Sequence, residues 1–167
     1  HTGWNVDLAM KRPQPKRFVS RESKADFIRE CQAWVGLNLH PNIVSCYYIR
    51  EIDHMPTIFA EWMDGGSLKD AIRRGTLYQG SKLEQKSRLL DIAIQIARGL
   101  AYAHKRDLIH QDIKPDNLLL TSQWDAKVGD FGLSRAKNAF QFVEDALDEF
   151  DEANGDLTMY LPTGGCT

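Results

Sequence analysis

Cysteine is scarce in this chain, and its three cysteines follow no recognised ligand spacing. Cys31, Cys46 and Cys166 are an odd number, and no two of them form a C-x-x-C pair. A disulfide framework needs paired cysteines and a zinc site needs closely spaced ligands, so neither is indicated. The default expectation is a reducing, cytoplasmic environment, in which any metal ion is held by oxygen atoms.

The sequence also lacks low-complexity stretches, internal repeats and a secretory signal peptide. Its most apolar segment, about Lys86 to Lys105, is helical in propensity and apolar over more than one face, which predicts a central core helix. Asp91 and Arg98 interrupt this segment, and it falls short of the roughly 20 apolar residues that a membrane helix needs. With 167 residues, 43% of them apolar, the chain is long enough to bury a core. We expect a globular protein with no membrane segment and no nucleic-acid partner.

Basic residues are missing from the C-terminal part of the chain. Between Asn138 and Thr167 there are seven acidic residues and no Lys or Arg. Because like charges repel, we favour a solvated loop over a short amphipathic helix in residues 139–150. An EF-hand is excluded by the spacing. With Gly155 as the sixth loop residue, Phe150 and Leu161 would fall at ligand positions.

Residues 110–117 carry a dense group of polar side chains, and an Asp-Phe-Gly sequence starts at Asp130, 13 residues later. Asp112 is a carboxylate that could take a proton from an attacking hydroxyl group. Lys114 could compensate charge on a moving phosphoryl group, and Asn117 and Asp130 offer oxygen ligands for Mg²⁺. The pattern predicts a phosphoryl-transfer site.

This combination resembles the protein kinase family. The catalytic-loop pattern H-R-D-x-x-x-x-N is met at His110, Asp112 and Asn117, and D-F-G is met unchanged from Asp130. The resemblance implies an α+β, bilobal protein kinase-like fold, ATP and Mg²⁺ as cofactors, and a protein substrate. Gln111 replaces the Arg of the pattern. A neutral amide cannot make a bidentate bond to phosphate, so control by phosphorylation of the segment that follows is not expected.

The N-terminal part extends the resemblance. Residues 8–11, Leu-Ala-Met-Lys, resemble the V-A-I-K strand, which implies that Lys11 holds the α- and β-phosphates. Its partner should be a Glu on the next helix, and the apolar spacing predicts an amphipathic helix from about Lys24 to Leu39. We assign Glu30 as that partner. The alternative is that Glu22, or no residue, pairs with the lysine.

Residues 57–63 read as a short apolar strand, and a Gly-Gly pair soon afterwards breaks it. This stretch resembles the hinge between the two lobes of a kinase. The resemblance implies that the backbone of Glu61 and Met63 contacts the adenine edge, while Ala60 gates a pocket behind adenine. A methyl group there should admit bulky adenine analogues. The equally weighted alternative is that Ala60 simply packs against a large neighbour such as Trp34.

Two further short strands, 118–120 and 126–129, should bring the metal ligands together. By resemblance, Leu119 lies under the adenine ring and Ala9 above it. An ordinary role for both residues in the core is compatible with the same pattern.

The resemblance divides the chain into a partial kinase N-lobe, residues 1–63, and a partial C-lobe, residues 64–167, truncated at both ends. Neither the Gly-rich loop nor an A-P-E motif is present in the sequence. We therefore expect marginal stability and weak or no catalysis from these residues alone. Lys114, two positions after the catalytic Asp, resembles the serine/threonine-specific group, with a lean toward bacterial-type enzymes.

Two alternatives from other classes remain. The chain could belong to a pseudokinase that serves as a binding or scaffold module, although the set of Lys11, Asp112, Asn117 and Asp130 argues against it. It could also be a small-molecule phosphotransferase of the aminoglycoside-kinase type, which shares a His-x-Asp loop. Lys114 and the Phe-Gly pair after the metal Asp disfavour that class.

Overall fold

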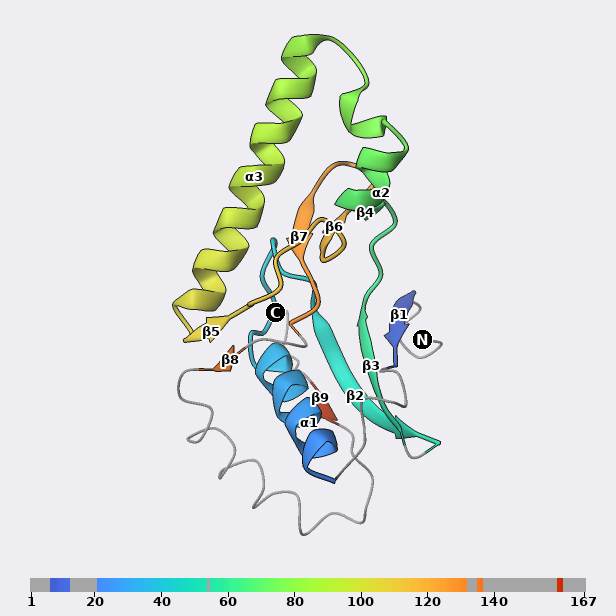
Figure 1. Cartoon of the computed structure of the whole chain (residues 1–167), viewed down its shortest axis with the longest axis vertical. Helices are drawn as coiled ribbons and strands as arrows, with labels where there is room; N and C mark the ends of the chain where they lie inside the picture. Colours follow the sequence, from blue (N-terminus) through green and yellow to red (C-terminus); the bar gives the residue numbers. More distant parts are fainter. Residues whose placement is uncertain (1–6, 13–20, 54, 132–134, 137–158, 161–167) are drawn as a thin grey trace, which may run out of the picture.

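A computed structural model describes residues 7–12, 21–53, 55–131, 135–136 and 159–160, without the side chains of residues 21–26, 30, 135–136 and 159–160. Helices and strands are mixed, so the α+β class is confirmed (Figure 1). The strands are β1 (Leu8–Lys11), β2 (Cys46–Ile52), β3 (Met55–Glu61), β4 (Gly66–Ser67), β5 (Leu108–Ile109), β6 (Leu118–Leu120), β7 (Ala126–Val128), β8 (Arg135–Ala136) and β9 (Met159–Tyr160). The helices are α1 (Arg21–Val35), α2 (Leu68–Arg73) and α3 (Lys82–His104), with a 3₁₀ turn η2 (Thr76–Tyr78).

A four-stranded antiparallel sheet with the order β1-β3-β2-β9 forms one part of the molecule. The register pairs Ala9 with Ala60 and Lys11 with Ile58, so β1 lies directly beside the end of β3. Helix α1 packs against β2 through Phe27, Cys31 and Trp34, which are all buried. These residues recur at four- and three-residue spacing and form one helical face. The predicted helix is confirmed, although it ends at Val35 rather than Leu39.

A second sheet, with the order β4-β6-β7, holds the segment that precedes Asp130. Gly65 and Gly66 lead into it from the end of β3. A Cβ atom on Gly65 would lie 2.6 Å from the backbone oxygens of Leu120 and Thr121, and Gly66 has a φ of 77°. The close approach at one position and the left-handed conformation at the next both require glycine. The Gly-Gly pair therefore lets the chain turn tightly from β3 onto β6.

Helix α3 is the longest element and lies along β7 (Figure 1). It begins with a capping box, in which Ser81 and Glu84 each accept the other's backbone N–H. The sequence pattern predicted a central core helix, but the structure buries only one face, at Ile92, Gly99 and Ala103. The exposed large apolar residues of α3 are Leu83, Leu89, Leu90 and Ile94. No described helix is both long and apolar enough to cross a bilayer.

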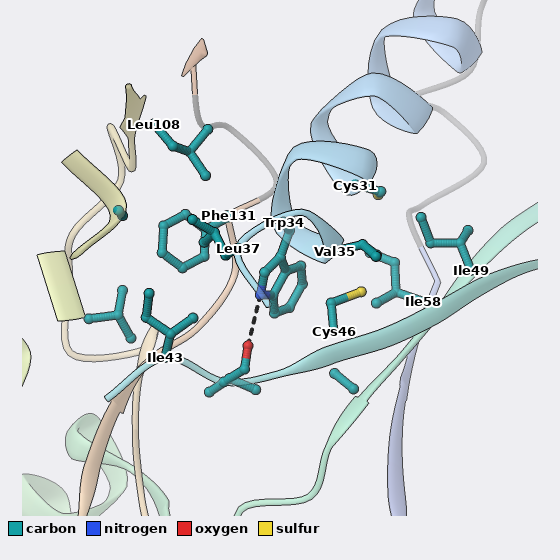
Figure 2. Packing of buried hydrophobic residues seen from close by; sticks show 14 of the residues in the cluster. Cys31, Trp34, Val35, Leu37, Ile43, Cys46, Ile49, Ile58, Leu108 and Phe131 are labelled. Carbon is teal, nitrogen blue, oxygen red and sulfur yellow. Dashed lines mark hydrogen bonds between the residues drawn. The ribbon is translucent and has the colours of Figure 1, made fainter. Parts of the chain in front are cut away.

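One hydrophobic cluster joins the four-stranded sheet to the rest of the molecule (Figure 2). Trp34 of α1 lies at its centre, and the indole Nε1 donates a hydrogen bond of 2.8 Å to the backbone oxygen of Val44. Phe131, which is fully buried, packs against Trp34 with ring centroids 6.2 Å apart. Helix α1 and the Asp-Phe-Gly segment therefore share a core, so a shift of one is felt by the other.

His40, in the turn after α1, makes folding sensitive to pH. Its Nδ1 accepts the backbone N–H of Asn42 at 3.1 Å, and its ring packs against that of Tyr102 at a tilt of 33°, with centroids 4.2 Å apart. Burial, and then the charges of Arg106 and Lys127, lower the pKa of His40 below its ordinary 6.5. The folded state thus prefers the neutral ring, while the unfolded chain takes up a proton near its ordinary pKa.

We expect the stability that His40 contributes to be complete above about pH 6.5 and to be lost as the pH falls through the lowered folded-state pKa. Urea unfolding at several pH values between 7.5 and 5.5 should show this loss. His40→Asn should flatten the slope, because an amide oxygen can accept the same N–H without titrating. Equal slopes for the two proteins would contradict the assignment.

Candidate active site

The loop from His110 to Asn117 is fixed by the buried His110 ring. His110 is 1% exposed, and its Nε2 lies 2.7 Å from the backbone oxygen of Gly129. The backbone N–H of Asp112 points at its Nδ1 at 3.3 Å, so Nδ1 accepts and Nε2 carries the proton that is donated to Gly129. Gln111 between them has a φ of 62°, a left-handed conformation that is uncommon for a residue other than glycine. The hydrogen bonds of the His110 ring therefore hold the backbone of Asp112 in place.

Two residues that were predicted for the site, Lys114 and Asn117, hold the carboxylate of Asp112 by hydrogen bonds. Lys114 Nζ donates to Asp112 Oδ2 at 2.5 Å, and Asn117 Nδ2 donates to the same oxygen at 3.0 Å and to the backbone oxygen of Asp112 at 2.8 Å. The Lys114 hydrogen bond, followed by the weaker one from Asn117, lowers the pKa of Asp112, and the same ion pair raises the pKa of Lys114. The carboxylate therefore stays ionised and has a fixed direction at neutral pH.

The hairpin of β6 and β7 brings Asn117 and Asp130 together. The backbone N–H of Gly129 donates to the backbone oxygen of Asn117 at 2.8 Å, which aligns the residues at the two open ends of the hairpin. Because the side-chain nitrogen of Asn117 is used by Asp112, its side-chain oxygen is the atom left for a cation. Asp130 has a φ of 57° and forms an ion pair with Lys11.

This donor set fits Mg²⁺. The ion prefers oxygen ligands, keeps several waters and usually takes one or two side-chain oxygens together with substrate phosphates. Among the described residues no group of three or more His, Cys, Asp or Glu side chains could hold a metal ion alone. A site completed by phosphate oxygens is consistent with both facts.

A cavity of about 180 Å³ joins these residues to the end of β3. Seven of the residues predicted for the site line it: Ala9, Lys11, Ala60, Glu61, Asn117, Leu119 and Asp130. Five residues of the lining were not predicted to touch the ligand: Trp34, Val44, Ile58, Asp116 and Gly129. The cavity is smaller than the 300–1,000 Å³ of typical ligand sites, so it accommodates a base-sized group within its walls. The cavity thus brings together the residues predicted to contact adenine and those predicted to contact the phosphates and the metal ion.

Among the predicted residues whose side chains the structure describes, Met63, Asp112 and Lys114 are not part of this lining. Met63 is buried and its backbone oxygen accepts the N–H of Gly66, but Met63 is not part of the lining. The side chain of Glu30 lies outside the described residues, so its pairing with Lys11 stays a prediction. The described partner of Lys11 is Asp130. Sequence spacing alone gave no sign of that contact, because Lys11 and Asp130 are far apart in the sequence.

A larger hollow, of about 800 Å³, is lined by one side of α3 and by residues 41–42 and 123–125. Its lining includes Arg88, Asp91, Arg98 and Trp124, and it contains none of the predicted site residues. Arg88 is already engaged there, since its guanidinium donates to backbone oxygens of Leu77 and Gln79 and lies over the Trp124 ring. We therefore place the site in the smaller cavity, where the predicted phosphoryl-transfer groups meet.

Ala60 and Trp34 both line the small cavity, so the methyl group does not seal its rear wall. We expect Ala60→Met to weaken binding of an ATP analogue with a bulky substituent on the adenine amino group by about tenfold, since the longer side chain fills that space. Binding of ATP itself should change much less. Competition titrations with both nucleotides measure the two effects, and equal losses for both would show that the space behind Ala60 is not used.

Comparison with known proteins agrees with this geometry. The family model described as "Protein kinase domain" matches residues 2–147 of this chain. A probable serine/threonine-protein kinase of Streptomyces coelicolor is 40% identical over 117 residues, which are 68% of this chain and 16% of that protein. Serine/threonine-protein kinase PrkC of Bacillus subtilis is 38% identical over 111 residues, 66% of this chain and 16% of that protein.

The tyrosine-protein kinase Btk of Drosophila melanogaster also matches, at 34% identity over 113 residues that cover 68% of this chain and 14% of that protein. The chain thus spans about a sixth of the length of these curated relatives. The family description covers most of the chain, including Lys11, the catalytic loop and the Asp-Phe-Gly segment. The chain belongs to the protein kinase domain family, and the kinase-like fold expected from its motifs is confirmed.

Proposed function

We propose that this chain carries the nucleotide-binding and catalytic residues of a serine/threonine protein kinase, which transfers the γ-phosphoryl group of ATP to a protein hydroxyl group. The observation that carries the proposal is the convergence of Lys11, Asn117 and Asp130 on one cavity, with Asp112 hydrogen-bonded to Asn117 at its edge. The similarity to bacterial serine/threonine-protein kinases supports the choice of acceptor.

Each side chain has a role that its surroundings support. Asp112, ionised and oriented by its two neighbours, accepts the proton of the acceptor hydroxyl group. Lys114 lies beside it and offsets negative charge on the phosphoryl group as the group moves. Lys11 binds phosphate oxygens. In this structure its amino group pairs with the carboxylate of Asp130 instead. Most of the catalytic effect therefore comes from positioning and electrostatics.

Asn117 and Asp130 would hold Mg²⁺ through their side-chain oxygens. When bound, the ion neutralises charge on the phosphates and fixes their geometry. Leu119 and Ala9, both in the lining, offer apolar surfaces for the adenine ring, and Glu61 brings the end of β3 to its edge. A cytoplasmic location remains a prediction from cysteine usage.

The test is an acceptor assay with ATP labelled at the γ-phosphate, run on the longest natural polypeptide that contains this chain. We expect label on serine or threonine after phosphoamino-acid analysis of a mixed protein substrate, and none on kanamycin. Label on kanamycin alone would favour the small-molecule phosphotransferase, and label on tyrosine alone would overturn the acceptor assignment. Binding of Mg·ATP without any transfer would favour a scaffold role.

A further inference from the structure

An ion pair between Glu61 and Lys127 has no assigned role in the transfer reaction, yet it is better shielded than the surface pairs. Lys127 Nζ lies 2.5 Å from Glu61 Oε1, and the two side chains are 23% and 16% exposed for Glu61 and Lys127, respectively. By contrast, Lys69 and Asp116 pair with exposures of 48% and 44%. A partly buried pair is less screened by water and salt, so it holds its geometry more firmly.

The carboxylate of Glu61 uses both of its oxygens. Oε1 accepts from Lys127, while Oε2 accepts the backbone N–H of Ser45 at 3.2 Å. The backbone N–H of Glu61 in turn donates to the backbone oxygen of Ser45 at 2.9 Å. Three segments therefore meet at one side chain: the start of β2, the end of β3, and β7.

Strand β7 is fixed on both sides around Lys127. It pairs with β6 on one edge, and on the other edge Val128 exchanges backbone hydrogen bonds of 2.9 Å with Asn42 and Val44. Lys127 is three residues before Asp130, and the backbone between them is tied to Asn117 through Gly129. A displacement of Lys127 along the strand is thus passed on to the proposed metal ligand.

We propose that Glu61 and Lys127 are positioning residues that set the distance between the adenine end and the metal end of the nucleotide site. Glu61 lines the cavity where β3 ends, and Asp130 lines the same cavity after β7. The ion pair links these two strands directly through their side chains. The inference rests on the proposed function, because it assumes that a nucleotide spans both ends. Neither residue takes part in the chemical step.

A rigid spacing matters only to a ligand that touches both ends. ADP with Mg²⁺ reaches from the adenine contacts to Asn117 and Asp130, whereas adenosine lacks the phosphates and reaches only the first. Loss of the ion pair should therefore weaken Mg·ADP much more than adenosine. A residue that merely stabilised the fold would affect the two ligands alike.

The test compares Lys127→Met, Lys127→Arg and Glu61→Gln in calorimetric titrations of the longest natural polypeptide that contains this chain, with Mg·ADP and with adenosine. We expect Lys127→Met to weaken Mg·ADP about tenfold and adenosine less than twofold, and Lys127→Arg to restore Mg·ADP to within twofold of the parent. The double variant Glu61→Gln/Lys127→Met should be no weaker than Lys127→Met, since both changes break one link. Asp53→Asn, which removes the distant surface partner of Arg12, is the matched control and should leave both ligands unchanged.

Equal weakening of both ligands in Lys127→Met, or failure of Lys127→Arg to restore binding, would overturn the positioning role. So would unchanged Mg·ADP binding accompanied by a lower melting temperature. If the parent chain binds neither ligand, the proposed function fails, and the inference falls with it. Binding by the parent with no selective loss in the variants overturns the inference alone.

Discussion

Replacing Asp112 with Asn is expected to lower the rate of phosphoryl transfer to protein by about 10²- to 10⁴-fold, the range for loss of a general base. The amide keeps the size of the side chain, so the loop geometry set by His110 survives. It cannot accept the proton of the acceptor hydroxyl group, and it no longer pairs with Lys114, whose 2.5 Å contact depends on the charge. Initial rates with saturating Mg·ATP, in the longest natural polypeptide that contains this chain, measure the effect.

Nucleotide affinity should change little in Asp112→Asn, because Asp112 is not part of the cavity lining. Asp107→Asn is the matched control. Asp107 is exposed and has a φ of 57°, a conformation that Asn also tolerates, and it lies just before β5 and outside the cavity. A variant at position 112 that kept more than a tenth of the parent rate would contradict the role of Asp112 as the base.

Gly99→Ala is expected to destabilise the fold by about 3 kcal/mol or more, at the upper end of what overpacking costs. A Cβ atom at this position in α3 would lie 2.3 Å from the backbone oxygen of Asn42, and backbone cannot move aside as a flexible side chain can. The same oxygen accepts the N–H of Val128 at 2.9 Å. The added methyl group therefore forces α3 away from the segment that supports β7, and this cost exceeds the roughly 1 kcal/mol that alanine gains over glycine in a helix.

Urea unfolding of the parent protein and of Gly99→Ala measures the difference in their free energies of unfolding. Gly75→Ala is the control, since nothing lies within 4 Å of an added Cβ there and only its φ of 69° disfavours alanine. That variant should lose about 1 kcal/mol. An unchanged unfolding midpoint for Gly99→Ala, with a lowered midpoint for Gly75→Ala, would show that α3 does not approach Asn42 as closely as the structure places it.

The catalytic loop could be predicted because its spacing is local. His110, Asp112, Lys114 and Asn117 lie within eight positions, so one loop conformation fixes their relations. The strands of the β6–β7 hairpin were likewise readable from two short apolar runs around a turn. The start of α3 at Lys82, earlier than predicted, also has a local signal, the capping box at Ser81 and Glu84, which the apolar periodicity alone did not reveal.

Contacts between distant segments could not be predicted in the same way. Glu61 and Lys127 are separated by 66 positions, and their pairing depends on how β3 and β7 approach in the folded chain. The contact of Lys11 with Asp130 is of the same kind. Periodicity also overstated the burial of α3, because an apolar residue in a helix is buried only where another element covers it, and Leu90 remains 61% exposed.

The central claim is that Asn117 and Asp130 bind one divalent cation together with a nucleotide. It is tested most directly by titrating ADP into the longest natural polypeptide that contains this chain, with and without Mg²⁺, and repeating both titrations with Asp130→Ala. We expect Mg²⁺ to strengthen ADP binding by about tenfold or more in the parent and to have no effect in Asp130→Ala, because a cation needs the carboxylate oxygen. Equal ADP affinity with and without Mg²⁺ in the parent would contradict the account.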